Sequence, residues 1–194
     1  MADTDHWHPP RRHLAQRGLP LSRFTGLGGR RDLRFVQVGL RTPQDDAEHK
    51  YEALFHLDAA NAVVDDQTKT ARSDQADGSY VSIIPLADEL LTVEIVKGRE
   101  EDPVQGWAGQ PWRAIPTAVY RRSGRGVVRL QFVLEPTAKG AQPAISRLEP
   151  NTAALTDLGA RVRFADGRAL EIAPPDKTGA IVFTWSTTRS GPGP

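Results

Sequence analysis

The 194-residue chain contains no cysteine. Without cysteine it cannot form a disulfide framework, and it has no thiolate for nucleophilic catalysis or metal binding. This absence fits a reducing compartment, and it also fits the many periplasmic proteins that use no disulfides. A stable fold must therefore rest on a packed core, and the chain is long enough to build one in a single domain.

Long apolar segments are absent as well. No run approaches the roughly 20 residues that a membrane-spanning helix needs, so we expect no membrane partner. Residues 1–10 do not show the charged-then-apolar layout of a secretory signal. From this N-terminus alone we expect a cytoplasmic protein.

Neither sign of charge is in marked excess, because 25 Lys and Arg residues oppose 24 Asp and Glu residues. The balance gives no reason to expect nucleic acid as a partner. The distribution is less even, since residues 1–31 are rich in arginine and nearly free of acids. Such an arm can bind polyanions, although a solvated tail is the simpler interpretation.

Alternation of apolar and polar residues is the main positive signal. Tyr51, Ala53, Phe55 and Leu57 share one face of residues 50–57, which predicts a half-buried strand. The same reasoning predicts further strands at residues 33–38, 62–64, 68–71, 80–85, 90–96, 115–121, 127–134, 161–164, 169–172 and 180–185.

About ten short strands at spacings of roughly 8–12 residues predict an all-β fold, an antiparallel β-sandwich. Asp166-Gly167 is the strongest hairpin signal between them, and residues 152–158 are the only helix candidate. We expect an irregular basic arm at residues 1–31, a β-sandwich domain at 32–186 and a disordered tail at 187–194.

One loop carries the best candidate binding residues. Trp107 and Trp112 lie within residues 104–113, at the end of a long loop predicted over residues 98–111, and Arg113 directly follows Trp112. Aromatic faces stack on the apolar faces of sugar rings, and arginine pairs with carboxylates and sulfates. These residues are candidates for carbohydrate binding, with the alternative that one or both tryptophans plug the end of the core, Trp107 more than Trp112.

Histidines supply the remaining candidates. His56 lies on the polar face of residues 50–57, where a strand histidine can act as a general base or stabilise a carboxylate of a bound carbohydrate, although a surface histidine bonded to its neighbours is the simpler interpretation. His6-x-His8 has a metal-like spacing, but a site needs three or four convergent ligands on a rigid frame. We therefore predict no metal site, no cofactor and no catalytic residue that sequence context alone positions.

Four segments occur in an order that resembles a known family. They are Tyr51-Glu52-x-Leu54-Phe55-His56-Leu57, Ile95-Val96-Lys97-Gly98, Val104-Gln105-Gly106-Trp107 and Pro116-Thr117-Ala118-Val119-Tyr120. Over residues 31–137 the chain resembles the C-terminal β-sandwich of heparinase II/III-like polysaccharide lyases, which include alginate-lyase-type enzymes. The likeness weakens toward residue 175.

The resemblance implies a relation to enzymes that cleave uronate-containing polysaccharides by β-elimination. In that family an α/α toroid precedes the sandwich, and the catalytic Tyr and His come from the toroid and the early sandwich strands. The family's sandwich metal site also lies in those early strands. Nothing before Arg30 matches these regions, so the resemblance transfers no catalytic residue and no metal ligand.

Three functions follow as expectations. The chain is the sandwich portion of such a lyase, truncated or split and silent alone; or it is a stand-alone carbohydrate-binding module; or it docks a separately encoded toroid. The expected partners are acidic polysaccharide and such a toroid, and the family would imply a periplasmic or secreted location. A further departure, at residues 35–43, predicts an incomplete sheet with an unpaired edge.

Overall fold

A computed structural model describes residues 22–24, 33–41, 47–151, 159–173 and 183–187. Every regular element in these residues is a β-strand, and all the strand pairs are antiparallel. The predicted all-β, antiparallel class is confirmed. No helix in this part of the chain is long and apolar enough to cross a membrane.

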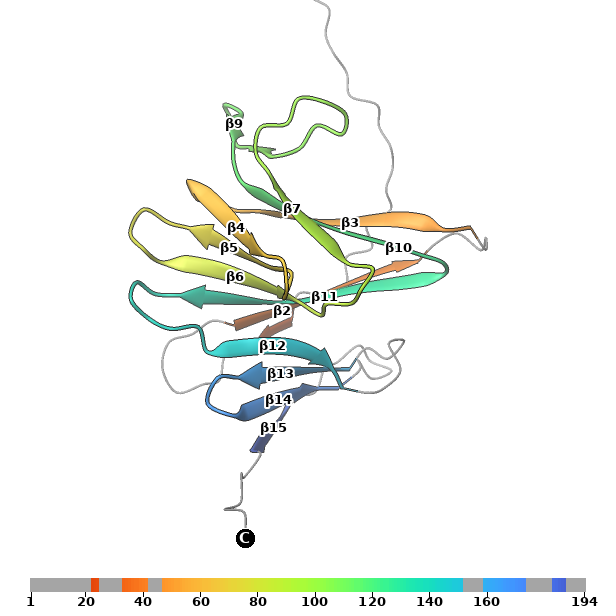
Figure 1. The fold of residues 1–194 in the computed structure, drawn as a ribbon, viewed down its shortest axis with the longest axis vertical. Coiled ribbons are helices and arrows are strands. Elements are labelled where there is room, and N and C mark those ends of the chain that lie inside the picture. Colours follow the sequence, from red (N-terminus) through yellow and green to blue (C-terminus); the bar gives the residue numbers. More distant parts are fainter. Residues whose placement is uncertain (1–21, 25–32, 42–46, 152–158, 174–182, 188–194) are drawn as a thin grey trace, which may run out of the picture.

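The strands form three sheets and one small hairpin (Figure 1). Sheet A has the order β1 (Ser22–Phe24), β2 (Leu33–Arg41), β11 (Val127–Thr137), β6 (Tyr80–Pro85), β5 (Thr70–Asp74) and β4 (Asn61–Asp65). Sheet B has the order β3 (His49–His56), β10 (Thr117–Gly124) and β7 (Thr92–Val96). Sheet C runs from β12 (Ile145–Pro150) through β13 (Ala160–Phe164) and β14 (Arg168–Ile172) to β15 (Phe183–Thr187), and the hairpin pairs β8 (Trp107–Ala108) with β9 (Arg113–Ala114).

The first core lies between sheets A and B. Three aromatic rings meet there edge to face: Phe55, Tyr120 and Phe132, with centroids 4.8–5.9 Å apart. The predicted apolar face of β3 points into this core, because Ala53 and Leu57 are buried and Phe55 packs against the same cluster. Period-two alternation therefore gives the correct inward face for this strand.

The hydroxyl of Tyr120 joins the two sheets that enclose this core. It accepts a hydrogen bond from the Ala71 backbone N–H at 3.1 Å, and it lies 3.0 Å from the Ile83 carbonyl and 3.1 Å from the Lys69 carbonyl. Burial raises the pKa of Tyr120 far above its usual value, so the group stays neutral. A buried polar group that is fully hydrogen-bonded fixes register without a desolvation penalty.

A second core lies on the opposite face of sheet A, against sheet C. Ile84 and Val133 of sheet A pack there with Ile145, Leu148 and other apolar residues of sheet C. Neighbouring residues of β11 thus serve different cores, Phe132 the first and Val133 the second. The sequence predicts one sandwich, whereas the described strands form three layers with sheet A in the middle.

Most predicted strands are present, with shifted ends. The clearest omission is β12, whose buried Ile145 and Leu148 lie three residues apart. A register shift between Ile145 and Arg147 breaks the alternation, so the period-two signal is lost there. The helix candidate at residues 152–158 lies outside the described residues.

The N-terminal part corrects two expectations. Strand β2 continues through Gly39 to Arg41 and pairs with β11 along its length and with β1 on its other side. It is therefore not the unpaired edge that the departure at residues 35–43 predicts. Ser22–Phe24 forms β1, although residues 1–31 were expected to be irregular.

Candidate functional site

The segment between β7 and β10, residues 97–116, folds back on itself and is called here the crossover loop. Its two halves pair through the backbone: Gly98 N–H donates to the Gly106 carbonyl at 3.0 Å, and Ile115 N–H donates to the same carbonyl at 2.8 Å. Arg99 and Gln105 also exchange backbone hydrogen bonds, at 2.9 and 3.2 Å. The loop is therefore a fixed structure that includes the β8–β9 hairpin (Figure 1).

Gly106 makes this close approach possible. Its φ is +80°, and a Cβ there would lie 2.7–2.8 Å from backbone atoms of Val96, Lys97 and Gly98. Only glycine satisfies both the left-handed backbone and the missing side-chain volume. The Val104-Gln105-Gly106-Trp107 segment, quoted for its family resemblance, thus has a physical reason for its glycine.

An ion-pair network connects the crossover loop to the outer face of sheet B. Arg121 of β10 donates through Nε to Glu52 of β3 at 2.5 Å and through Nη1 to Glu94 of β7 at 2.6 Å. From the loop, Arg99 donates to Glu94 at 3.0 Å and the Gln105 amide donates to Glu52 at 3.0 Å. These contacts therefore join strands β3, β7 and β10 and the crossover loop in one network.

The network changes the ionisation of its members. Burial disfavours the charge of Arg121, but its hydrogen bonds with Glu52 and Glu94 outweigh that cost and raise its pKa. The hydrogen bond from Arg121 holds the pKa of Glu94 below its usual value, aided by Arg99. Glu94 is therefore ionised at neutral pH, and both carboxylates already accept hydrogen bonds, so the network serves as a clamp.

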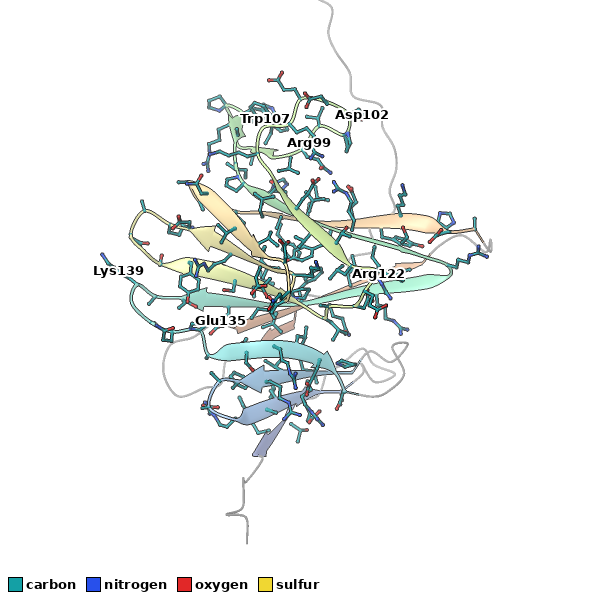
Figure 2. All side chains as sticks on the ribbon, viewed as in Figure 1. Arg99, Asp102, Trp107, Arg122, Glu135 and Lys139 are labelled. Atoms are coloured by element: carbon teal, nitrogen blue, oxygen red, sulfur yellow. The ribbon has the colours of Figure 1, made fainter. Side chains whose placement is uncertain are left out.

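Trp107 acts as an internal support for the loop. Its indole Nε1–H donates to the Arg99 carbonyl at 3.0 Å, and its ring lies beside Gly98 (Figure 2). The side chain is half-buried. Trp107 therefore packs within the crossover loop and belongs to neither of the two core clusters.

Trp112 has the opposite environment. It is 71 % exposed, the highest value among the exposed large hydrophobic residues in the described part of the chain. It lies in the turn of the β8–β9 hairpin, directly before Arg113. An aromatic ring held in solvent by a fixed hairpin is available for contact with a ligand.

Arg113 lies at the same tip and has one ionic partner. Its Nη2 lies 2.7 Å from Asp58 Oδ1, and both side chains are well exposed, at 57 % and 83 %. Lys97 reaches the same segment, donating through Nζ to the Ala60 carbonyl at 2.9 Å. Two cations thus border the residues that follow β3, beside the hairpin.

His56 is placed next to these residues along the chain but makes a different contact. Its Nδ1 shares a 2.8 Å hydrogen bond with the hydroxyl of Thr117, its cross-strand partner. The structure brings Arg113 together with Asp58, and Trp107 with Arg99, but no described contact joins His56 to Arg113 or Trp107 to Trp112. Among the four predicted residues, Trp112 and Arg113 alone form an exposed pair.

Sequence reasoning missed a groove on the face of sheet A that packs against sheet C, beside the start of β12. The groove has a volume of about 400 Å³, and its lining includes Arg72, Tyr80, Ser82 and Glu135. The predicted strand at residues 68–71 stops before Arg72, whereas β5 continues to Asp74. Correct strand ends, followed by alternation, would have placed Arg72 on this face.

In the described residues, no three His, Asp or Glu side chains lie close enough together to hold a metal ion. His6 and His8 lie outside those residues. In comparisons with known proteins, the chain matches no family model, no curated protein and no solved structure.

Proposed function

We propose that this protein is a non-catalytic binding module that holds an acidic polysaccharide at the tip of the β8–β9 hairpin. The observation that carries the proposal is the 71 % exposure of Trp112 beside Arg113 on a fixed hairpin. A sugar ring would stack on the indole, and Arg113 would pair with a carboxylate or sulfate of the same or the next sugar.

Arg113 can make this contact at little cost. Its ion pair with Asp58 lies at the surface, where such pairs contribute little to stability. The guanidinium carries five N–H donors, and the Asp58 contact uses one of them. Lys97, on the same side of the hairpin base, adds attraction for a polyanion.

The hairpin supports the proposal through its rigidity. The Trp107 indole, the backbone pairs around Gly106 and the ion-pair network all fix the base from which Trp112 projects. A binding surface that is ordered before it meets its ligand loses less entropy on binding.

Titration calorimetry tests the proposal. The intact chain should release heat with heparin or alginate oligomers and none with neutral dextran. Trp112→Ala should weaken binding at least about fivefold, because one stacking contact is lost. Leu90→Ala, at another well-exposed apolar residue, should leave the affinity unchanged. Binding that survives in Trp112→Ala, or no binding by the intact chain, would contradict the proposal.

The relation to heparinase II/III-like lyases remains part of this proposal, together with the docking of a separate toroid. It is supported by contacts between three of the quoted segments: Gln105 donates to Glu52, and Gly98 N–H donates to the Gly106 carbonyl. These residues of the quoted segments hold the loop against sheet B. A relative of the lyases could therefore keep this fold without catalysing β-elimination. Alone, the chain should generate no ultraviolet-absorbing unsaturated uronate ends from alginate or heparin.

A further inference from the structure

The groove on sheet A is independent of the hairpin and lies on the face that sheet B does not cover. Its floor contains one row of side chains that crosses four strands in register: Val63 of β4, Arg72 of β5, Ser82 of β6 and Glu135 of β11. Adjacent strands lie about 4.8 Å apart, so the row spans roughly 14 Å. This length and the volume of about 400 Å³ suit a small molecule.

At one end of the row, Glu135 is bonded to the protein backbone. Glu135 is fully buried, and its carboxylate accepts hydrogen bonds from the backbone N–H groups of Ala144 and Ile145 at 2.5 and 3.2 Å. This contact attaches the start of β12 to sheet A, and Glu135, Pro143, Ile145 and Ser146 line the groove there. Glu135 is labelled in Figure 2, and both of its oxygens are already used in hydrogen bonds within the fold.

Arg72 is not matched in this way. Within the described residues no carboxylate pairs with it, and its neighbours in the row are Val63 and Ser82. Its guanidinium carbon lies 5.0 Å from the centre of the Tyr80 ring. A ring contact of this kind orients the guanidinium while its N–H donors stay available for an anion.

Four Ser and Thr hydroxyl groups line the same groove as Arg72. Thr68, Thr70, Ser82 and Ser146 all line the groove, and the Thr68 hydroxyl lies 3.0 Å from that of Thr70. Asp65 lines the same end, with a pKa held below its usual value by hydrogen bonds from the backbone N–H groups of Thr68 and Gln67. An ionised carboxylate beside hydroxyls favours ligand hydroxyl donors and disfavours a ligand that carries several negative charges.

We propose that this groove binds a small hydroxylated monocarboxylate, with its carboxylate on Arg72 and its hydroxyls on the Thr68, Thr70 and Ser82 side. Arg72, a single cation, can pair with one carboxylate of the ligand. The hydroxyl groups that line the groove can bond the ligand's own hydroxyls. The site does not depend on the hairpin, since its lining includes no residue of the crossover loop.

Nuclear magnetic resonance titration of the full ¹⁵N-labelled chain tests the proposal, with gluconate as the probe. Sorbitol has the hydroxyls without the carboxylate, and propionate has the carboxylate without the hydroxyls. Gluconate should shift the amide signals of Arg72, Thr70 and Ser82 and saturate with a Kd on the order of 1 mM. Sorbitol and propionate should each bind at least about tenfold more weakly.

Two variants separate the groove from other cations and from the hairpin. Arg72→Met keeps an apolar stem over Tyr80 and should weaken gluconate binding at least about tenfold. Arg125→Met, at an exposed arginine in the β10–β11 turn, should change nothing. Trp112→Ala should also leave gluconate binding intact, so failure at the hairpin and failure at the groove are distinguishable.

Three results would overturn the proposal. The first is no saturable shift by gluconate at concentrations about tenfold above the expected Kd. The second is equal binding of either control ligand, because then the carboxylate or the hydroxyls are not recognised. The third is unchanged affinity in Arg72→Met, provided that its thermal unfolding matches that of the parent chain.

Discussion

Arg121 and Arg72 both project from the middle of a strand, on faces that point away from the core between sheets A and B, but their surroundings differ. Arg121 of sheet B has two carboxylate partners, and a loop lies over it. Arg72 of sheet A has a tyrosine ring, hydroxyl groups and an open groove. An arginine whose donors are used within the chain stabilises the fold, whereas one whose donors are unused is suited to a ligand.

The largest effect should come from closing the space beneath the crossover loop. Gly106→Ala should lower the free energy of unfolding by about 3 kcal/mol or more, because the new Cβ meets backbone atoms that cannot move aside. Chemical denaturation measures the loss.

Gly167→Ala is the matched control. Gly167 has a similar φ, +84°, but no atom lies within 4 Å of its added Cβ. Only backbone strain remains, which should cost about 1–2 kcal/mol. If both variants lose the same amount, the close approach at Gly106 contributes nothing and the loop is less tightly fixed than described.

A smaller loss of stability should distinguish Arg121 from Arg72. Arg121→Met should lower the free energy of unfolding by about 1–2 kcal/mol, because Glu52 and Glu94 lose the cation that they share. The side chains are about one-third exposed, so solvent reduces the penalty. Arg72→Met should stay within about 0.5 kcal/mol of the parent. Equal losses in the two variants, measured by denaturation, would remove the contrast between a clamp and a binding group.

How much of the fold the sequence predicts depends on how far apart in the chain the contacting residues are. Strand β3 and the Asp166-Gly167 turn are local patterns, and both are present, since β13 and β14 flank that turn. Arg121 and Glu52 are 69 residues apart, and Arg121 and Glu94 are 27 apart. Alternation assigns each to the outer face but cannot state which strands become neighbours.

The candidate sites divide in the same way. Trp112 and Arg113 are adjacent, so composition alone identifies them as a pair. The groove depends on the register of four strands drawn from residues 61–137, and no local pattern contains that information. Its central residue, Arg72, also lies just beyond the predicted strand, which ends at residue 71, three residues before the end of β5.

The smallest effect concerns two carboxylates whose pKa values are lowered for different reasons. Glu94 depends chiefly on Arg121, whereas Asp65 depends on the backbone N–H groups of Thr68 and Gln67. A carboxyl group with a lowered folded-state pKa stabilises the fold above its unfolded pKa, and that contribution is lost as the pH falls through the folded value. Stability carried by Glu94 should therefore be lost below about pH 4.5, its ordinary pKa.

Carbon-detected titration of the side-chain carboxyls measures both groups. In Arg121→Met the pKa of Glu94 should rise toward its ordinary value, and the acid-dependent loss of stability should shrink. In Arg72→Met the pKa of Asp65 should not move, because backbone groups set it. A matching rise at Asp65 would show that Arg72 is electrostatically coupled to it and is not a free cation.

Strand β11 has a consequence for how the molecule comes apart. Its alternate side chains belong to the two cores, Phe132 to one and Val133 to the other, and Glu135 also holds the chain that leads into sheet C. Neither core can lose this strand without opening its neighbour. We therefore expect the two cores to unfold together, as one cooperative unit linked through β11.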